Sequence, residues 1–151
     1  MRLQNARRQF GKTLEAGRQT VVPALTAEKA YLLAEAHQAK RQISQARQFY
    51  AQALQQAPFS AETVLAAARL EQRLKQTEKA YNLTLNALPL NDNDPGLLKT
   101  YIDLCLDMRL TDYAQDALPR LQAAVPPADY QAYLTHYQAR RALLQKEQES
   151  F

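Results

Sequence analysis

Three side chains in this sequence could perform general acid–base or nucleophilic chemistry: His37, Cys105 and His136. A histidine can move protons near neutral pH and a cysteine thiolate can attack a carbonyl carbon, but each needs a neighbouring group that activates or orients it. The sequence contains no HExxH, no GxSxG and no paired carboxylates. We therefore predict that the chain is not an enzyme.

Metal and cofactor patterns are missing as well. The single Cys105 excludes an internal disulfide and a multi-cysteine zinc site. The chain has only three glycines, Gly11, Gly17 and Gly96, and they form neither GxGxxG nor GxxxxGK[ST]. Nucleotide binding by glycine-rich loops of those kinds is ruled out. We predict no metal and no cofactor.

The most pointed binding pattern lies near the C-terminus, where three tyrosines fall at i, i+3 and i+7 and two arginines follow one turn on: Tyr130, Tyr133, Tyr137, Arg140 and Arg141. Such spacing places the tyrosines on one helical face. Tyrosine and arginine anchor many interfaces because each combines a large contact area with a polar tip. The patch either receives a peptide, a partner helix or another copy of this chain, or packs onto a helix over 111–123 as an intramolecular cap.

The elements that must position these residues are predicted to be helices. Ala, Leu and Gln number 26, 23 and 18 among 151 residues, and all three favour helix, whereas the residues that fill sheets are scarce. With 46% hydrophobic and 23% charged residues the chain should fold. No apolar run is long enough to span a membrane and no signal peptide begins the chain, so we expect no membrane insertion and, if the chain is complete, a cytoplasmic location.

A period of 34 residues divides the middle of the chain into rows at 27–60, 61–94 and 95–128. Alanine recurs at the eighth place of two rows and at the twentieth place of all three: Ala34 and Ala68, then Ala46, Ala80 and Ala114. Each row holds two amphipathic stretches of helical length, opened by residues that favour helix N-caps: Thr26, Ser44, Ser60, Thr77, Asp94 and Thr111. Each row is thus predicted to be a helix-turn-helix hairpin. Because one hairpin cannot bury its apolar stripe alone, the rows should stack into a rod with a concave and a convex side.

Further residues fall in register with these columns: Tyr50, Ala53, Ala87 and Pro58, with His37 at a place where an aromatic residue is usual. Together the rows resemble the tetratricopeptide repeat (TPR) family over residues 27–128. The resemblance implies an all-α, right-handed α-solenoid and a single domain. Its parts would be an N-terminal helix over 1–23, repeats at 27–60, 61–94 and 95–128, and a capping helix over 129–148, eight helices in all.

The resemblance also assigns individual residues. It places His37 and Cys105 at equivalent positions in hairpin cores, which implies a packed or hydrogen-bonded histidine and an inert buried thiol, while His136 is expected to be structural or at the surface. The third row departs most from the pattern, because Ile102 stands at the usually small eighth place. Pro119 inside its second helix should kink or shorten that helix.

In TPR proteins the concave groove is lined by the second, fifth, ninth and twelfth places of each first helix. In this sequence those places include Tyr31, Glu35, Gln38, Leu65, Arg69, Gln72, Lys99 and Asp103, besides Glu28, Glu62, Gly96 and Leu106. In the fourth register the same places hold Tyr130, Tyr133 and Tyr137. The residues that grip chaperone C-terminal carboxylates are replaced here by Tyr31, Glu35, Ala66 and Thr100, which disfavours a chaperone-tail receptor. The resemblance implies a non-enzymatic scaffold that binds a protein or peptide in this groove.

Two other function classes are compatible with the helical pattern. Residues 1–50 carry nine Lys or Arg against three Asp or Glu, which could attract nucleic acid, but only Phe10 supplies an aromatic ring among the N-terminal arginines. Nucleic-acid binding is therefore disfavoured. The main alternative to peptide binding is a structural or self-association module that dimerises within a larger assembly.

Overall fold

The computed structural model describes residues 26–149, and this part of the chain is all-helical. It contains seven α-helices, one short 3-10 helix and no strand: α1 (Ala27–Ala39), α2 (Ile43–Gln56), α3 (Ala61–Arg73), α4 (Thr77–Ala87), η1 (Leu88–Leu90), α5 (Pro95–Asp107), α6 (Thr111–Ala124) and α7 (Pro127–Glu149). The predicted all-α class is confirmed. None of the helices within 26–149 is long and apolar enough to cross a membrane. The helix expected over 1–23 lies outside the described residues.

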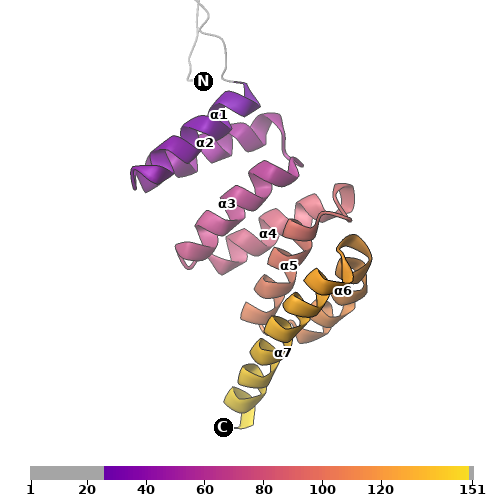
Figure 1. Ribbon diagram of the computed structural model, residues 1–151. Coiled ribbons are helices and arrows are strands. Elements are labelled where there is room, and N and C mark those ends of the chain that lie inside the picture. The colour runs from indigo at the N-terminus through magenta and orange to yellow at the C-terminus, as the bar shows by residue number, and fades with distance from the viewer. Residues whose placement is uncertain (1–25, 150–151) are drawn as a thin grey trace, which may run out of the picture.

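The helices form three consecutive hairpins, each in contact with the next (Figure 1). Contacts are most extensive within a hairpin: α1 with α2, α3 with α4, and α5 with α6. Between hairpins, α2 packs on α3 and α4 packs on α5, while α7 packs against both α5 and α6. Figure 1 shows α1 and α7 at opposite ends of this series. The hairpin boundaries coincide with the rows of the 34-residue period.

The first helix of each hairpin begins at a side-chain cap that the sequence predicted. Oxygen atoms of Thr26, Ser60 and Asp94 accept hydrogen bonds from the backbone N–H three residues on, at 3.2, 3.4 and 2.9 Å respectively. Pro95 takes the first position of α5, where its missing N–H leaves no bond unmade. These caps satisfy backbone donors that the helix itself cannot pair. They therefore set the residue at which α1, α3 and α5 begin.

The second helix of each hairpin is introduced by a backbone turn that the sequence did not predict. Arg41, Lys75 and Arg109, spaced by 34 residues, have φ of 61°, 63° and 65°. In each turn the following N–H donates to the carbonyl five residues earlier: Gln42 to His37 at 2.8 Å, Gln76 to Glu71 at 2.8 Å, and Leu110 to Cys105 at 2.7 Å. This is the Schellman arrangement, with a basic residue at the left-handed position that glycine usually occupies.

Side-chain caps on the second helices were expected at Ser44, Thr77 and Thr111, and this prediction is wrong. Helix α2 begins at Ile43, one residue before Ser44. The residues at the three cap positions, Gln42, Gln76 and Leu110, make no side-chain capping hydrogen bond. The preceding turn already directs the backbone into the second helix, so no side-chain cap is needed to start it.

The recurring alanines lie where helices touch. Seven of them have no exposed surface: Ala34, Ala46, Ala53, Ala68, Ala80, Ala87 and Ala114. In the third repeat, Ile102 and Leu121 take two of the same places and are also completely buried. Because an alanine methyl lets two backbones approach closely, the small residues set the helix spacing in the first two repeats. Larger apolar residues fill the core around α5, α6 and α7.

Prolines lie inside α6 and directly after α4, the second helices of the third and second hairpins. Pro119 does not shorten α6, which has 14 residues, as many as α2. Pro119 and Gln115, whose carbonyl loses its helical donor, are both exposed, so water can replace the missing bond. The shortened second helix is α4, which ends at Ala87 and continues as η1 with Pro89 in its first turn. The final helix starts two residues earlier than predicted, at Pro127.

Candidate functional site

The reactive side chains on α1 and α5 are held in structural contacts. His37 stacks on Phe49 with ring centroids 5.2 Å apart, and its Nδ1 lies 2.6 Å from Gln42 Oε1. Cys105 is completely buried, and burial raises the pKa of its thiol. Both placements confirm the prediction of a packed histidine and a buried cysteine. Among residues 26–149, no three His, Cys, Asp or Glu side chains are grouped so that they could hold a metal ion.

Six of the predicted groove residues line one pocket between α1 and α3. The pocket has a volume of about 300 Å³, and its lining comprises Tyr31, Glu35, Gln38, Tyr50, Glu62, Leu65, Ala66, Arg69 and Arg73. All of these except Tyr50, which belongs to α2, lie on the first helices of two successive hairpins. The structure thus brings equivalent places of the first and second repeats to one concave site.

Hydrogen bonds fix one wall of this pocket. The Tyr50 hydroxyl donates to Glu35 Oε2 at 2.8 Å and lies equally close to Gln38 Oε1. The Tyr31 ring meets Tyr50 edge-on, with centroids 6.1 Å apart. Burial, followed by the hydrogen bond to Glu35, raises the pKa of Tyr50, and burial, followed by the charges of Glu35 and Glu62, raises that of Tyr31. Both phenols are therefore neutral hydrogen-bonding groups.

The opposite wall carries two cations. Arg69 and Arg73 lie one helical turn apart on α3, and both are exposed. Neither makes a hydrogen bond or an ion pair with another residue of the described range. A guanidinium with unused donors can bind a carboxylate through two parallel hydrogen bonds. The pocket thus combines the free donors of Arg69 and Arg73 with two carboxylates, Glu35 on α1 and Glu62 on α3.

Leu65 reaches from α3 to the start of α5, where it leans over Gly96. A Cβ atom at Gly96 would lie 2.7 Å from Leu65 Cδ2, closer than carbon atoms normally approach. The missing side chain therefore leaves room for Leu65 at the edge of the pocket. Gly96 is the only glycine within the repeats.

The third repeat contributes differently, because α7 covers its groove positions. Tyr133 of α7 donates to Asp103 Oδ1 at 2.7 Å and lies 3.3 Å from the Lys99 carbonyl oxygen. His136, half exposed, lies 3.4 Å from the same Asp103 oxygen. Lys99, Asp103 and the half-buried Gln72 do not line the pocket. The concave pocket is therefore confined to the first two repeats.

The tyrosine and arginine patch faces the protein itself. Tyr130, Tyr133 and Tyr137 are 8%, 8% and 5% exposed, so their rings offer little free surface. Arg140 pairs with Asp107 of α5, and Arg141 donates to the Tyr137 hydroxyl at 2.9 Å. These contacts favour the intramolecular cap over the external interface. Helix α7 packs on α6, as that alternative predicts, and also on α5, with which it makes its hydrogen bonds and ion pairs.

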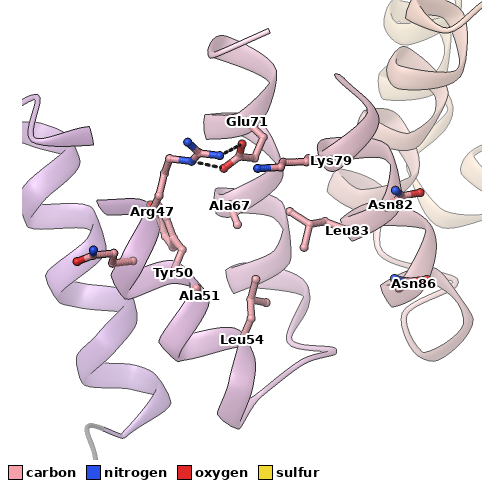
Figure 2. A pocket seen from close by; sticks show the side chains of 11 residues that line it. Arg47, Tyr50, Ala51, Leu54, Ala67, Glu71, Lys79, Asn82, Leu83 and Asn86 are labelled. Atoms are coloured by element: carbon pink, nitrogen blue, oxygen red, sulfur yellow. Dashed lines mark hydrogen bonds and ion pairs between the residues drawn. The ribbon is translucent and has the colours of Figure 1, made fainter. Parts of the chain in front are cut away.

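A second cleft, which the sequence did not predict, lies between α2 and α4 with α3 as its floor (Figure 2). Its volume is about 520 Å³. Apolar atoms come from Tyr50, Ala51, Leu54, Ala67 and Leu83, and the polar lining consists of Arg47, Gln48, Glu71, Lys79, Asn82 and Asn86. Figure 2 shows Arg47, Glu71 and Lys79 together at one end and Leu54 at the other.

An ion pair bridges the first two hairpins at the polar end of this cleft. Arg47 Nε donates to Glu71 Oε2 at 2.9 Å and Arg47 Nη2 donates to Glu71 Oε1 at 3.0 Å. Glu71 is only 8% exposed, and the paired hydrogen bonds hold the guanidinium plane in one orientation. Lys79, by contrast, makes no ion pair with another described residue and is exposed.

Sequence reasoning missed some lining residues for identifiable reasons. Arg73 is one turn beyond Arg69 on the same face, so helical spacing alone would have included it. Arg47 and Glu71 are separated by 24 residues on helices of different hairpins, and no local pattern links them. Comparison of the sequence with models of known protein families and with curated protein sequences finds no significant match.

Proposed function

We propose that this chain is a non-enzymatic protein–protein interaction scaffold, a TPR-like right-handed α-solenoid that binds a peptide or partner protein in its concave groove. The observation that carries the proposal is the pocket between α1 and α3, which is lined from equivalent places of two repeats. Hairpins that contact their neighbours along the chain also support a solenoid, because repeat architectures are stabilised by nearest-neighbour contacts.

The lining of the pocket indicates what the ligand carries. Arg69 and Arg73 suit a carboxylate, and the exposed Glu62 suits a cationic group farther along the same segment. Leu65 and the Tyr31 ring offer apolar contact between the charges. Because the lining is mounted on packed helices, little ordering entropy is lost when a ligand binds.

Peptide selection followed by a matched pair of variants tests the proposal. Random peptides displayed on phage are selected against the whole chain, and the affinities of enriched peptides are measured by fluorescence anisotropy. Changing both Arg69 and Arg73 to alanine should weaken groove-bound peptides by about tenfold or more. Arg120→Ala, at an exposed position on α6 outside the pocket, is the control and should bind like the parent chain. Equal affinities for all three proteins would overturn the proposal.

Self-association is the second candidate, and one observation favours it. Leu32 on α1 and Leu143 on α7 are 56% and 60% exposed at opposite ends of the series of hairpins. End-to-end contact between copies would remove both from water. Sedimentation equilibrium distinguishes the candidates, since a mass that rises with concentration and returns to that of a monomer in Leu143→Glu would support association.

A further inference from the structure

The cleft between α2 and α4 has an internal counterpart one repeat later. A shift of 34 residues carries Arg47 to Tyr81, Ala67 to Tyr101 and Glu71 to Cys105. The same shift carries Ala51 to Leu85 and Leu54 to Leu88. The interface between the second and third hairpins therefore shows what occupies this position when larger side chains are present.

At that second interface an aromatic pair fills the space. The rings of Tyr81 and Tyr101 are stacked with centroids 5.9 Å apart and an angle of 23° between planes. Tyr101 is only 9% exposed. At the first interface Ala67 supplies a single methyl group in place of the Tyr101 ring. Ala67 on α3 leaves the cleft open where the next repeat has the buried Tyr101, and Ala51 on α2 is also smaller than its counterpart, the partly exposed Leu85.

The face of the Tyr81 ring, which stacks on the Tyr101 ring, also has an equivalent at the first interface. Arg47 occupies the equivalent place, and its two hydrogen bonds to Glu71 hold the guanidinium in a fixed plane. A planar guanidinium stacks on aromatic rings through cation–π and dispersion attraction. Arg47 can therefore replace Tyr81 as the stacking partner of a ring above Ala67 (Figure 2).

The charges around the cleft define the group that accompanies the ring. Arg47 and Glu71 neutralise each other, which leaves the exposed Lys79 as the remaining charge of the lining. The amides of Gln48, Asn82 and Asn86 add donors and acceptors along the rim. A carboxylate placed near Lys79 would complete the electrostatic match.

We infer that this cleft binds an aromatic side chain of a partner protein, in a segment that also carries an acidic residue close to the ring. The ring lies over Ala67 against the Arg47 guanidinium, and the acidic residue pairs with Lys79. This surface lies between the second helices of the first two hairpins and shares only Tyr50 with the pocket formed mainly by α1 and α3. It would give the scaffold a second binding site on another face.

The test fills the cleft with a larger side chain of the protein itself. Peptides selected on phage against the whole chain are counter-selected against Ala67→Tyr, which installs the residue found one repeat later. Peptides that survive on the parent chain alone should contain an aromatic residue with an Asp or Glu nearby. Their affinity should fall about tenfold or more in Ala67→Tyr and severalfold in Lys79→Glu. The Arg69→Ala, Arg73→Ala double variant should bind them normally.

Each other outcome is decisive. If no peptide distinguishes the parent chain from Ala67→Tyr, or if the distinguishing peptides lack aromatic residues, the inference is wrong. If the only peptides found are lost in the double arginine variant and retained in Ala67→Tyr, the concave groove is supported and the inference about the cleft is wrong. Ala51→Leu, which mimics the other small-to-large difference between the repeats, replaces Ala67→Tyr if circular dichroism shows that the tyrosine variant does not fold.

Discussion

The hydroxyl group of Tyr133 donates a 2.7 Å hydrogen bond to the carboxylate of Asp103, joining α7 to α5. In the 34-residue register Tyr133 stands at the fifth place of a fourth unit and Asp103 at the ninth place of the third, both groove positions. Two positions expected to face a ligand are therefore bonded to each other. Helix α7 closes the series of hairpins by occupying the groove of the last one.

Tyr133→Phe tests this closure. It removes the hydroxyl while keeping the buried ring, so Asp103 loses a short hydrogen bond to its charged group. We expect the free energy of unfolding to fall by about 1.5–3 kcal/mol, the usual contribution of such a bond. Urea denaturation followed by circular dichroism measures it. Tyr113→Phe, at a tyrosine that is 57% exposed, is the control and should change little. A Tyr133→Phe variant as stable as the parent chain would show that the bond contributes nothing.

Stability should also decrease in alkali. The pKa values of Tyr50, Tyr101 and Tyr133 are all raised above the ordinary 10.0, in each case chiefly by burial. Below pH 10 these phenols are protonated in both the folded and the unfolded chain, and the full stability is present. Above it the unfolded chain loses protons that the folded chain retains, so each tyrosine lowers the free energy of unfolding by about 1.4 kcal/mol per pH unit.

Urea titrations at a series of alkaline pH values check this dependence. Tyr133→Phe removes one of the three groups, and its stability should therefore fall less steeply with pH than that of the parent chain. Tyrosinate absorbance of the folded protein should rise only together with unfolding for these residues. A stability that stays level above pH 10 would contradict the expected linkage.

Local signals made the helical class and the first helix of each hairpin predictable. Thr26, Ser60 and Asp94 each cap the helix that follows them, so sequence alone locates its start. The starts of the second helices depend on a left-handed residue, and basic residues such as Arg41 and Lys75 carry no signature of that conformation. At these turns, packing of the hairpin imposes a positive φ, and this outweighs the preference of the basic residue for negative φ.

Of the two candidate sites, the pocket could be predicted from the sequence and the cleft could not. Tyr31, Leu65 and Arg69 were placed in one pocket by register, because the repeat carries each position to an equivalent location. The cleft over Ala67 results from missing volume between two hairpins. The sequence contains 26 alanines, and nothing in it marks Ala67 as the one beside an unfilled space. Comparison with Tyr101 at the equivalent position in the structure reveals that space.

The ion pair between hairpins should contribute more than its surface counterpart. Glu71 is nearly buried and accepts two hydrogen bonds from Arg47, so we expect Glu71→Ala to destabilise the chain by about 1–3 kcal/mol. Glu147 also accepts from an arginine, Arg109, at 2.8 Å, but both side chains are more than half exposed. Glu147→Ala should therefore cost less than about 0.5 kcal/mol.

Chemical denaturation of both variants under the same conditions makes the comparison. A double-mutant cycle with Arg47→Ala separates the pair's coupling from the loss of other contacts. Equal losses for Glu71→Ala and Glu147→Ala would show that the bridge between the hairpins contributes no more than an exposed pair.

Replacing Arg41 by glycine should stabilise the first hairpin. Arg41 has φ of 61°, where an L side chain crowds the backbone at a cost of about 1–2 kcal/mol, and glycine avoids this strain but loses about 0.5–1 kcal/mol through its freedom in the unfolded chain. The net gain should therefore lie between zero and about 1.5 kcal/mol. Lys40→Gly is the matched control: Lys40, one residue earlier, has φ of −89°, so glycine relieves nothing there and should destabilise. Urea denaturation measures the free energy of unfolding of both variants. Backbone strain at Arg41 predicts an increase for Arg41→Gly and a decrease for Lys40→Gly, whereas a general effect of adding glycine would change both in the same direction.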